Sequence, residues 1–295
     1  PSPPAAATPG ATAHWVQQAQ WLQQQGRLDE ALAALDQALA IDAGNADLHN
    51  RRGLLLQALG RSDAARAAYE QAVALLPRHA GAFNNLGTLF TQQGRWAEAA
   101  QAFGRAVALR PDHALAWHNL GYVQREQKAL DASVHSFEQA LAAAPAKPFL
   151  RGDLLHGRMR LCDWRCFDAD LQALQADLAA GAPACTPFVL LPALDRPDLQ
   201  RLAAERMAGL LYPPRAELGP IAPRPDDGRL RIAYLSGDFR EHPVASLTAQ
   251  LIELHDRRRF EVVALSHGPA TGDPMQRRLQ AAFDDFIDVA AMADA

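Results

Sequence analysis

Residues 80–112 read AGAFNNLGTLFTQQGRWAEAAQAFGRAVALRPD, and residues 114–146 read ALAWHNLGYVQREQKALDASVHSFEQALAAAPA. The second stretch begins 34 residues after the first and repeats its order of small, apolar and proline residues. A fixed period of this length predicts helical pairs that stack on their neighbours, because a single pair cannot bury its own apolar face. We count four units, at residues 12–45, 46–79, 80–113 and 114–147.

Three series of residues recur at this period, and each has a physical reason. In the first helix of a unit, glycines let the second helix cross closely, since larger side chains would hold the backbones apart; they are Gly53, Gly87 and Gly121. Between the two helices, a positive φ is tolerated best by glycine; these positions are Gly26, Gly60 and Gly94, with Lys128 as the exception. At the end of a unit, prolines stop the second helix; they are Pro77, Pro111 and Pro145.

The repeats also predict a binding surface. Asn85 and Asn119 occupy the same position on the first helices of adjacent units, where the earlier units have Gln17 and Arg51. An amide both donates and accepts hydrogen bonds, so a ladder of amides suits an extended peptide backbone. Arrays of stacked helical pairs are curved, and we expect Asn85 and Asn119 to bind an extended peptide on the concave face. The alternative is that they are ordinary exposed polar residues.

Composition excludes several classes of protein. A net charge of −4 and a pI of about 6.2 argue against a nucleic-acid or polybasic membrane surface. No apolar run approaches the ~18 residues of a membrane span, and the start lacks the features of a signal peptide, so we expect a cytoplasmic protein. Residues 1–11 are rich in Pro and Ala and predict a disordered tail. We expect buried free thiols at the three cysteines, which are Cys162, Cys166 and Cys185.

The pattern changes after the repeats. Residues 148–228 predict a helical spacer followed by a Pro-rich linker. From residue 229 onward, LRIAYL (230–235), FEVVALS (260–266) and FIDVA (286–290) predict strands, the first of them buried. PVASLTAQLIELHD (243–256) and DPMQRRLQAAFDDF (273–286) predict the helices between them. This alternation predicts a parallel, open α/β sheet.

The loop SGDFREHP, residues 236–243, leaves the first predicted strand at its carboxyl end. Ligands of open α/β sheets bind beyond this edge, so the loop is the candidate site. It is not the GxGxxG fingerprint of a dinucleotide site. We single out His242 as a candidate catalytic residue, with Asp238, Phe239 and Pro243 as its companions in the loop.

Taken together, the repeats, the helical spacer and LRIAYLSGDFREHPVASL resemble the O-linked N-acetylglucosamine transferase family, in particular its bacterial members with few tetratricopeptide repeats. The resemblance runs from about Trp15 to residue 295. It implies a tetratricopeptide α-solenoid followed by the start of a Rossmann-like lobe, in a two-lobed GT-B glycosyltransferase. Residues 229–295 would be the first part of the N-terminal catalytic lobe. We expect the second lobe to supply most nucleotide contacts, so residues 1–295 alone are expected to bind UDP weakly.

The same resemblance implies a reaction. The donor would be UDP-N-acetylglucosamine, the acceptors Ser and Thr hydroxyls of proteins, and transfer would invert the anomeric centre without a metal or cofactor. His242 would lie in the active site, and whether it acts as a base or positions a substrate stays open. Ser246 stands where some family members have a second histidine. The alternative is a tetratricopeptide scaffold for protein–protein interaction with an inactive α/β appendage.

Overall fold

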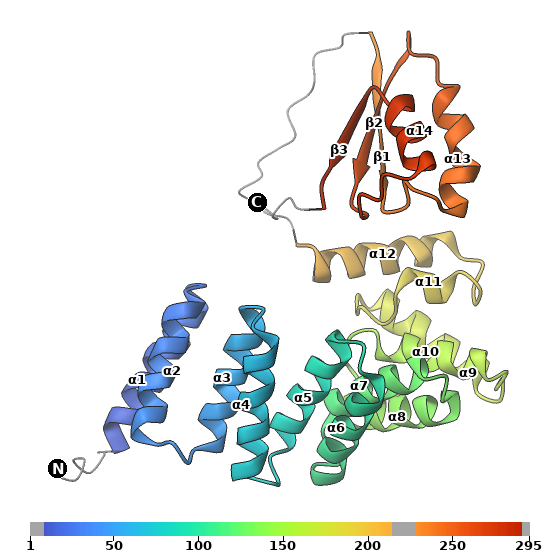
Figure 1. Cartoon of the computed structure of the whole chain (residues 1–295). Coiled ribbons are helices and arrows are strands. Elements are labelled where there is room, and N and C mark those ends of the chain that lie inside the picture. Colours follow the sequence, from blue (N-terminus) through green and yellow to red (C-terminus); the bar gives the residue numbers. More distant parts are fainter. Residues whose placement is uncertain (1–8, 214–227, 291–295) are drawn as a thin grey trace. The chain divides into compact units, whose positions relative to one another are not determined.

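The computed structural model describes residues 9–213 and 228–290, which form two compact units. We call residues 9–213 the helical unit and residues 228–290 the α/β unit, and describe each by itself. The helical unit consists of helices α1 to α12, and the α/β unit alternates strands with helices (Figure 1). Most of the expected Pro-rich linker lies outside the described residues.

The four predicted repeats form four consecutive helical pairs. Their helices are α1 (Pro9–Gln24), α2 (Leu28–Ile41), α3 (Ala46–Ala58), α4 (Ser62–Leu75), α5 (Ala80–Gln92), α6 (Trp96–Leu109), α7 (Ala114–Glu126) and α8 (Leu130–Ala143). Because α1 begins at Pro9, residues 9–11 are helical and do not belong to the expected disordered tail; residues 1–8 lie outside the described part of the chain. The first helices of successive repeats approach one another, α3 against α5 and α5 against α7, and therefore line the inside of the array.

The glycine series marks the helix crossings, as predicted. A Cβ atom built on Gly87 would lie 2.7 Å from the ring of Phe103, and one on Gly53 would lie 2.5 Å from the ring of Tyr69. Both rings are almost fully buried, so neither can move aside. The first helices of the second, third and fourth repeats thus pack their backbones directly onto an aromatic ring of the second helix.

Between the helices of each pair, the chain takes a left-handed conformation, also as predicted. The φ angles are 73° at Gly26, 72° at Gly60 and 69° at Gly94. Lys128 adopts the same conformation, with φ 63°, although it carries a side chain. The fourth repeat therefore keeps the geometry of the others and carries the strain that a non-glycine residue has there.

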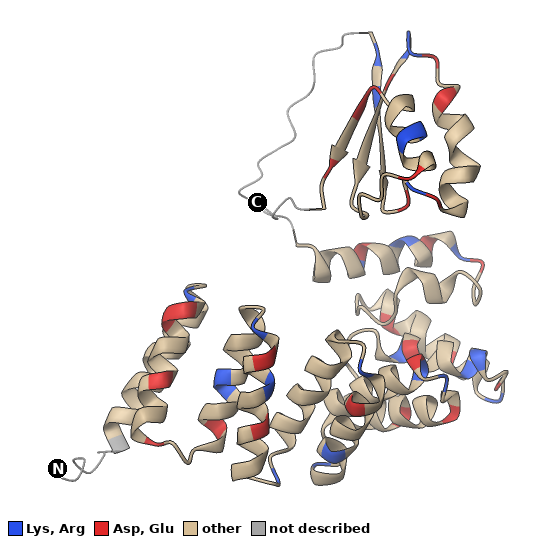
Figure 2. Ribbon diagram, in the orientation of Figure 1, with Lys and Arg blue, Asp and Glu red and all other residues tan. Residues whose placement is uncertain are grey.

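The helices after the repeats are α9 (Leu150–Arg160), α10 (Phe167–Ala179), α11 (Pro187–Leu190) and α12 (Pro197–Leu211). Helix α9 packs on α8 and continues the stack. A second core forms around Leu155, Leu174 and Leu190. Figure 2 shows acidic and basic residues interspersed along the helical unit, where they form ion pairs such as Arg52 with Asp36.

Cys185 is buried, and burial raises the pKa of its thiol to about 12. The expectation of buried thiols is wrong for Cys162 and Cys166, which are exposed. They do not share a helix face: α9 ends at Arg160, Cys162 lies beyond it with φ 56°, and Cys166 is the residue before α10.

The α/β unit is a parallel sheet with strand order β1 (Leu230–Ser236), β2 (Phe260–Ser266), β3 (Asp285–Asp288). Helices α13 (Pro243–Glu253) and α14 (Pro274–Ala282) connect the strands and pack against each other. Both helices lie on one face of the sheet (Figure 1), where Ile252 and Leu279 join Tyr234 and Val262 in the core.

The prediction that the first strand is buried is wrong. Leu230 and Leu235 of β1 are 68% and 67% exposed. Side chains alternate between the faces of a strand, so Leu235 points away from the helices that cover its neighbour Tyr234. In the described α/β unit, β1 is an edge strand, and helices cover only one face of the sheet.

Candidate functional site

The loop from Ser236 to Pro243 is anchored at its centre by an aromatic side chain. Phe239 is 5% exposed, and its ring contacts those of Phe283 and Phe286 at centroid distances of 5.3 and 5.8 Å. The phenyl ring belongs to the core under the sheet edge rather than to the surface that a ligand meets. Phe239 therefore fixes the loop, while the polar residues on either side stay accessible.

A second loop, after β2, packs against the start of this one. His267 N donates a hydrogen bond to Ser236 O at 3.2 Å. A Cβ atom on Gly268 would lie 1.9 Å from Gly237 O, so the two backbones are in direct contact. Only glycine fits there. Sequence reasoning missed this contact, for which the signal is a glycine shortly after each of two adjacent parallel strands.

His242 ends the loop and caps helix α13. Its Nδ1 accepts a hydrogen bond from Val244 N at 3.3 Å, and Pro243 is the first helical residue, as predicted. Asp238 Oδ2 lies 3.6 Å from Nδ1, too far for a hydrogen bond. A neutral imidazole has one donor and one acceptor nitrogen, so an accepting Nδ1 assigns the proton to Nε2. In this tautomer His242 offers an N–H group to a ligand.

The loop is also tied to the start of helix α14. Asp273 caps α14 by accepting from Gln276 N at 2.8 Å, and it accepts from Glu241 N at 3.0 Å. The Thr271 hydroxyl donates to the same carboxylate. These hydrogen bonds, that from Thr271 above all, lower the pKa of Asp273 to about 2. The sequence placed Asp273 at the start of a predicted helix but did not predict its bond to the neighbouring loop.

An open pocket of about 530 Å³ lies between α13 and α14, towards their amino ends. His242, Ser246, Met275 and Arg278 are among the residues that line it. The Arg278 guanidinium is held by both oxygens of Glu253, at 2.7 and 2.9 Å, which fixes its position and balances its charge. The pocket therefore combines an imidazole, a hydroxyl, an apolar wall and a fixed cation.

The second candidate surface is the row of amides on the first helices of the repeats. Asn85 Nδ2 donates to Asn50 Oδ1 at 2.9 Å, and Asn119 Nδ2 donates to Asn84 Oδ1 at 3.3 Å. Asn84 Nδ2 in turn donates to Asn85 Oδ1 at 3.4 Å. The ladder thus consists of four amides that bond one another across three repeats. Asn50 and Asn84 were missed from the sequence.

A similar polar link joins the last repeat to α9, the helix that follows it. His118 Nε2 lies 3.0 Å from Asp153 Oδ2, and Arg125 donates to Asp153 Oδ1 at 3.2 Å. Asp153 lies 34 residues after Asn119, and each link joins residues 35 apart: 50 with 85, 84 with 119, 118 with 153. Helix α9 therefore occupies the place of the first helix of a further repeat.

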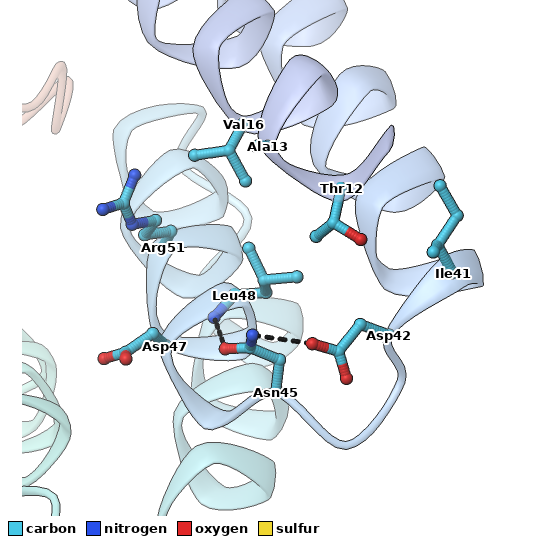
Figure 3. Close-up of a pocket in the computed structure, with 9 residues that line it drawn as sticks. All are labelled: Thr12, Ala13, Val16, Ile41, Asp42, Asn45, Asp47, Leu48 and Arg51. Atoms are coloured by element: carbon cyan, nitrogen blue, oxygen red, sulfur yellow. Dashed lines mark hydrogen bonds between the residues drawn. The ribbon is translucent and has the colours of Figure 1, made fainter. Parts of the chain in front are cut away.

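A hollow of about 660 Å³ opens at the other end of the array, between α1 and α3 (Figure 3). Asn45 donates to Asp42 Oδ2 at 2.8 Å on one side of it and caps α3 by accepting from Leu48 N. Arg51, which stands at the ladder position of the second repeat, also lines the hollow from α3. The hollow thus carries Arg51 together with Asp42 and Asp47, whereas amides stand at the ladder positions of the later repeats.

No helix within residues 9–213 and 228–290 is long and apolar enough to cross a membrane.

Family comparisons divide the chain in two. Residues 50–108 and 85–148 match a family described as tetratricopeptide repeat, and residues 22–60 match one described as TPR repeat. Residues 219–295 match glycosyl transferase family 41.

A curated Arabidopsis thaliana protein, described as the probable UDP-N-acetylglucosamine–peptide N-acetylglucosaminyltransferase SEC, is 34% identical over 65 residues. The match covers 22% of this chain and 7% of that protein, so the chain spans a small part of its relative.

Solved structures resemble the chain as well. A Pseudomonas aeruginosa PilF structure aligns with TM-score 0.52 and 22% identity, over 70% of this chain and 95% of that one. Desulfovibrio magneticus MamA aligns with TM-score 0.50 and 18% identity, over 57% and 94%. These two likenesses show the fold of the repeats. A mutant of Thermobaculum terrenum O-GlcNAc transferase aligns with TM-score 0.44 and 26% identity, over 85% and 42%.

The chain thus contains tetratricopeptide repeats followed by a segment, residues 219–295, that matches glycosyl transferase family 41.

Proposed function

We propose that the chain belongs to a protein O-N-acetylglucosaminyltransferase, in which UDP-N-acetylglucosamine is the donor and Ser or Thr residues of proteins are the acceptors. The observation that carries the proposal is the position of His242. It caps α13 at the carboxyl edge of a parallel sheet and lines a 530 Å³ pocket, within the segment that matches family 41.

The proposed transfer is a displacement at the anomeric carbon. The acceptor hydroxyl oxygen forms the new bond to that carbon from the face opposite UDP, and the bond from the carbon to the UDP oxygen breaks. UDP leaves with the bonding electron pair, and the hydroxyl proton passes to a base. In this proposal His242 is not that base, because its Nδ1 accepts from Val244 N and its Nε2 then carries the proton.

In this proposal His242 positions a substrate oxygen by donating from Nε2. The Asp238 carboxylate lies beside the ring, 3.6 Å from Nδ1, and is partly exposed. The pocket then presents the ring beside Ser246, the residue found where some relatives have a second histidine.

The amide ladder is the proposed acceptor site. Each asparagine has two donor hydrogens and two acceptor lone pairs, more than its bonds to neighbouring repeats use. An extended peptide along the first helices can therefore bond to Asn85 and Asn119 without displacing the links. The interaction reads the peptide backbone, which suits an enzyme that accepts many proteins.

Three variants of His242 in the full-length natural protein test the proposed role. Asn places an acceptor oxygen near the position of Nδ1 and keeps the cap. Gln places an amide N–H near the position of Nε2. Ala removes both. If His242 donates a hydrogen bond from Nε2, Gln retains more transfer than Ala, with a loss of roughly tenfold or less, whereas Asn keeps the cap but lacks the donor and retains less transfer than Gln. A general base contributes ~10²–10⁴-fold, so equal losses of that size in all three variants would refute donation from Nε2.

Donor binding provides a separate test. We expect the 295-residue chain to bind UDP more weakly than micromolar, because it covers only part of the catalytic region. Isothermal calorimetry with UDP measures this affinity directly. Micromolar binding by the chain alone would contradict the proposal that further residues form most of the nucleotide site.

The alternative, a scaffold with an inactive α/β appendage, predicts a different pattern. Protein partners would bind the repeats with equal affinity whether or not His242 is changed, and radiolabelled sugar would not appear on any of them. Transfer that depends on His242 would exclude it.

A further inference from the structure

The segment between β2 and α14, residues 267–273, contacts the His242 loop at both of its ends. At the strand end, His267 N bonds to Ser236 O, and Gly268 packs on the Gly237 backbone. At the helix end, Asp273 Oδ2 accepts from Glu241 N at 3.0 Å. Glu241 is the residue directly before His242. The first contact holds the start of the loop and the second holds its end. The second contact involves the backbone N–H group of the residue before the imidazole.

Asp273 joins two helix starts. Its Oδ1 accepts from Gln276 N and caps α14, while its Oδ2 accepts from Glu241 N, one residue ahead of the cap of α13. The amino ends of these two helices are the walls of the 530 Å³ pocket. A carboxylate can accept at both oxygens at once, whereas an amide would turn a donor group toward one of the two N–H groups.

Thr271 strengthens this arrangement, because its hydroxyl donates to the same Oδ2. Gly272 N also donates to Gln276 Oε1 at 2.6 Å, so the turn is bonded to α14 on both sides of the carboxylate. The turn is thus held independently of the loop that it contacts, and it offers a fixed acceptor to Glu241 N.

We propose that Asp273 is a positioning residue, whose carboxylate fixes the backbone beside His242 and thereby sets the place of the imidazole at the pocket. Its effect on sugar transfer rests on the proposed function, whereas its effect on the loop does not. Asp273 need not touch a substrate, because it acts through Glu241 and His242.

The first experiment uses the 295-residue chain and no substrate. Asp273→Asn keeps an acceptor for Gln276 N but sets an amide N–H group against Glu241 N. We expect the Glu241 amide to exchange with deuterium roughly tenfold faster or more, and the ring resonances of His242 to shift. Asp284→Asn is the matched control, because Asp284 also accepts from a backbone N–H, that of Val262, at the opposite end of the sheet. Unchanged Glu241 exchange and His242 resonances in Asp273→Asn, with the fold retained, would overturn the proposal.

The second experiment measures transfer in the full-length natural protein. Asp273→Asn is expected to lower kcat by roughly tenfold, and to cause no further loss in a His242→Ala background, because its effect passes through that ring. An equal loss in both backgrounds would refute positioning through His242. If His242→Ala transfers sugar at the normal rate, the proposed function of His242 fails, while the exchange experiment still decides whether Asp273 holds the loop.

Discussion

The contact between Gly87 and Phe103 allows a prediction whose sign follows from two opposing effects. Replacing a glycine in a helix by alanine favours the helix by about 1 kcal/mol, through a smaller loss of backbone entropy. At Gly87, however, the new Cβ would lie 2.7 Å from two ring carbons of Phe103, where about 3.5–4 Å is the ordinary contact. Phe103 is 1% exposed and has no room to move, so the helices must separate.

Overpacking of a well-filled core costs about 1–3 kcal/mol, which exceeds the gain in helix propensity. We therefore expect Gly87→Ala to lower the free energy of unfolding by up to about 2 kcal/mol. Gly104 is the matched control: it lies within α6, one residue after Phe103, and a Cβ there would meet no atom within 4 Å. Gly104→Ala should be stabilising, by up to about 1 kcal/mol.

The assay is urea unfolding of the 295-residue chain, followed by circular dichroism at the helical band. The two alanine variants should move the midpoint in opposite directions, and Gly87→Leu should lower it further than Gly87→Ala. Phe103→Leu in the Gly87→Ala background should recover part of the loss, giving a favourable coupling energy. A Gly87→Ala variant as stable as Gly104→Ala would refute the reasoning that this crossing is set by the missing Cβ.

Three further outcomes are expected. Lys128→Gly should stabilise the chain by about 1 kcal/mol, because glycine adopts the left-handed conformation at this position without strain; a lower urea midpoint would contradict this. Asn85→Ala with Asn119→Ala should weaken modification of long protein acceptors but leave donor hydrolysis nearly unchanged; equal losses in the two kinetic assays would mean that these residues support folding alone. Because the pKa of Asp273 is lowered from 3.8 to about 2, its bond to Glu241 N should be complete above pH 4 and lost as the pH falls through 2, a change that the Glu241 amide proton shift reports; a midpoint near 4 would contradict it.

The sequence predicted most of the repeat architecture because its determinants are local. A glycine at a fixed place between two apolar patches specifies a turn, and a proline after the second patch ends a helix. Lys128 shows the strength of this constraint, as the period places it in a left-handed turn that its own type disfavours. The sequence likewise predicted that one helix starts at Pro243 and another at about Asp273, close to where α13 and α14 begin.

The contacts that shape the candidate sites could not be predicted from single residues in this way. Asn50 bonds to Asn85 and Glu241 bonds to Asp273 across 35 and 32 residues, and such pairs depend on how neighbouring elements pack. The exposure of β1 also escaped prediction, because an apolar run does not tell whether both faces of its strand are covered. The tautomer of His242 depends on the hydrogen bond from Val244 N to Nδ1, which the sequence does not show.

The 35-residue offset of the polar links has a consequence for how such an array changes in size. In each amide link, an asparagine of one repeat donates to an asparagine of the repeat before it. A duplicated copy of residues 80–113 would therefore contain both a donor for the preceding repeat, Asn85, and an acceptor for the following repeat, Asn84. A gene segment of that length can be gained or lost without leaving an unmatched amide. The series of polar links ends at α9, because Gly152 occupies the acceptor position there and has no side chain. Copy number is therefore free to vary within the array, while its boundary with the following helices is marked by a single residue.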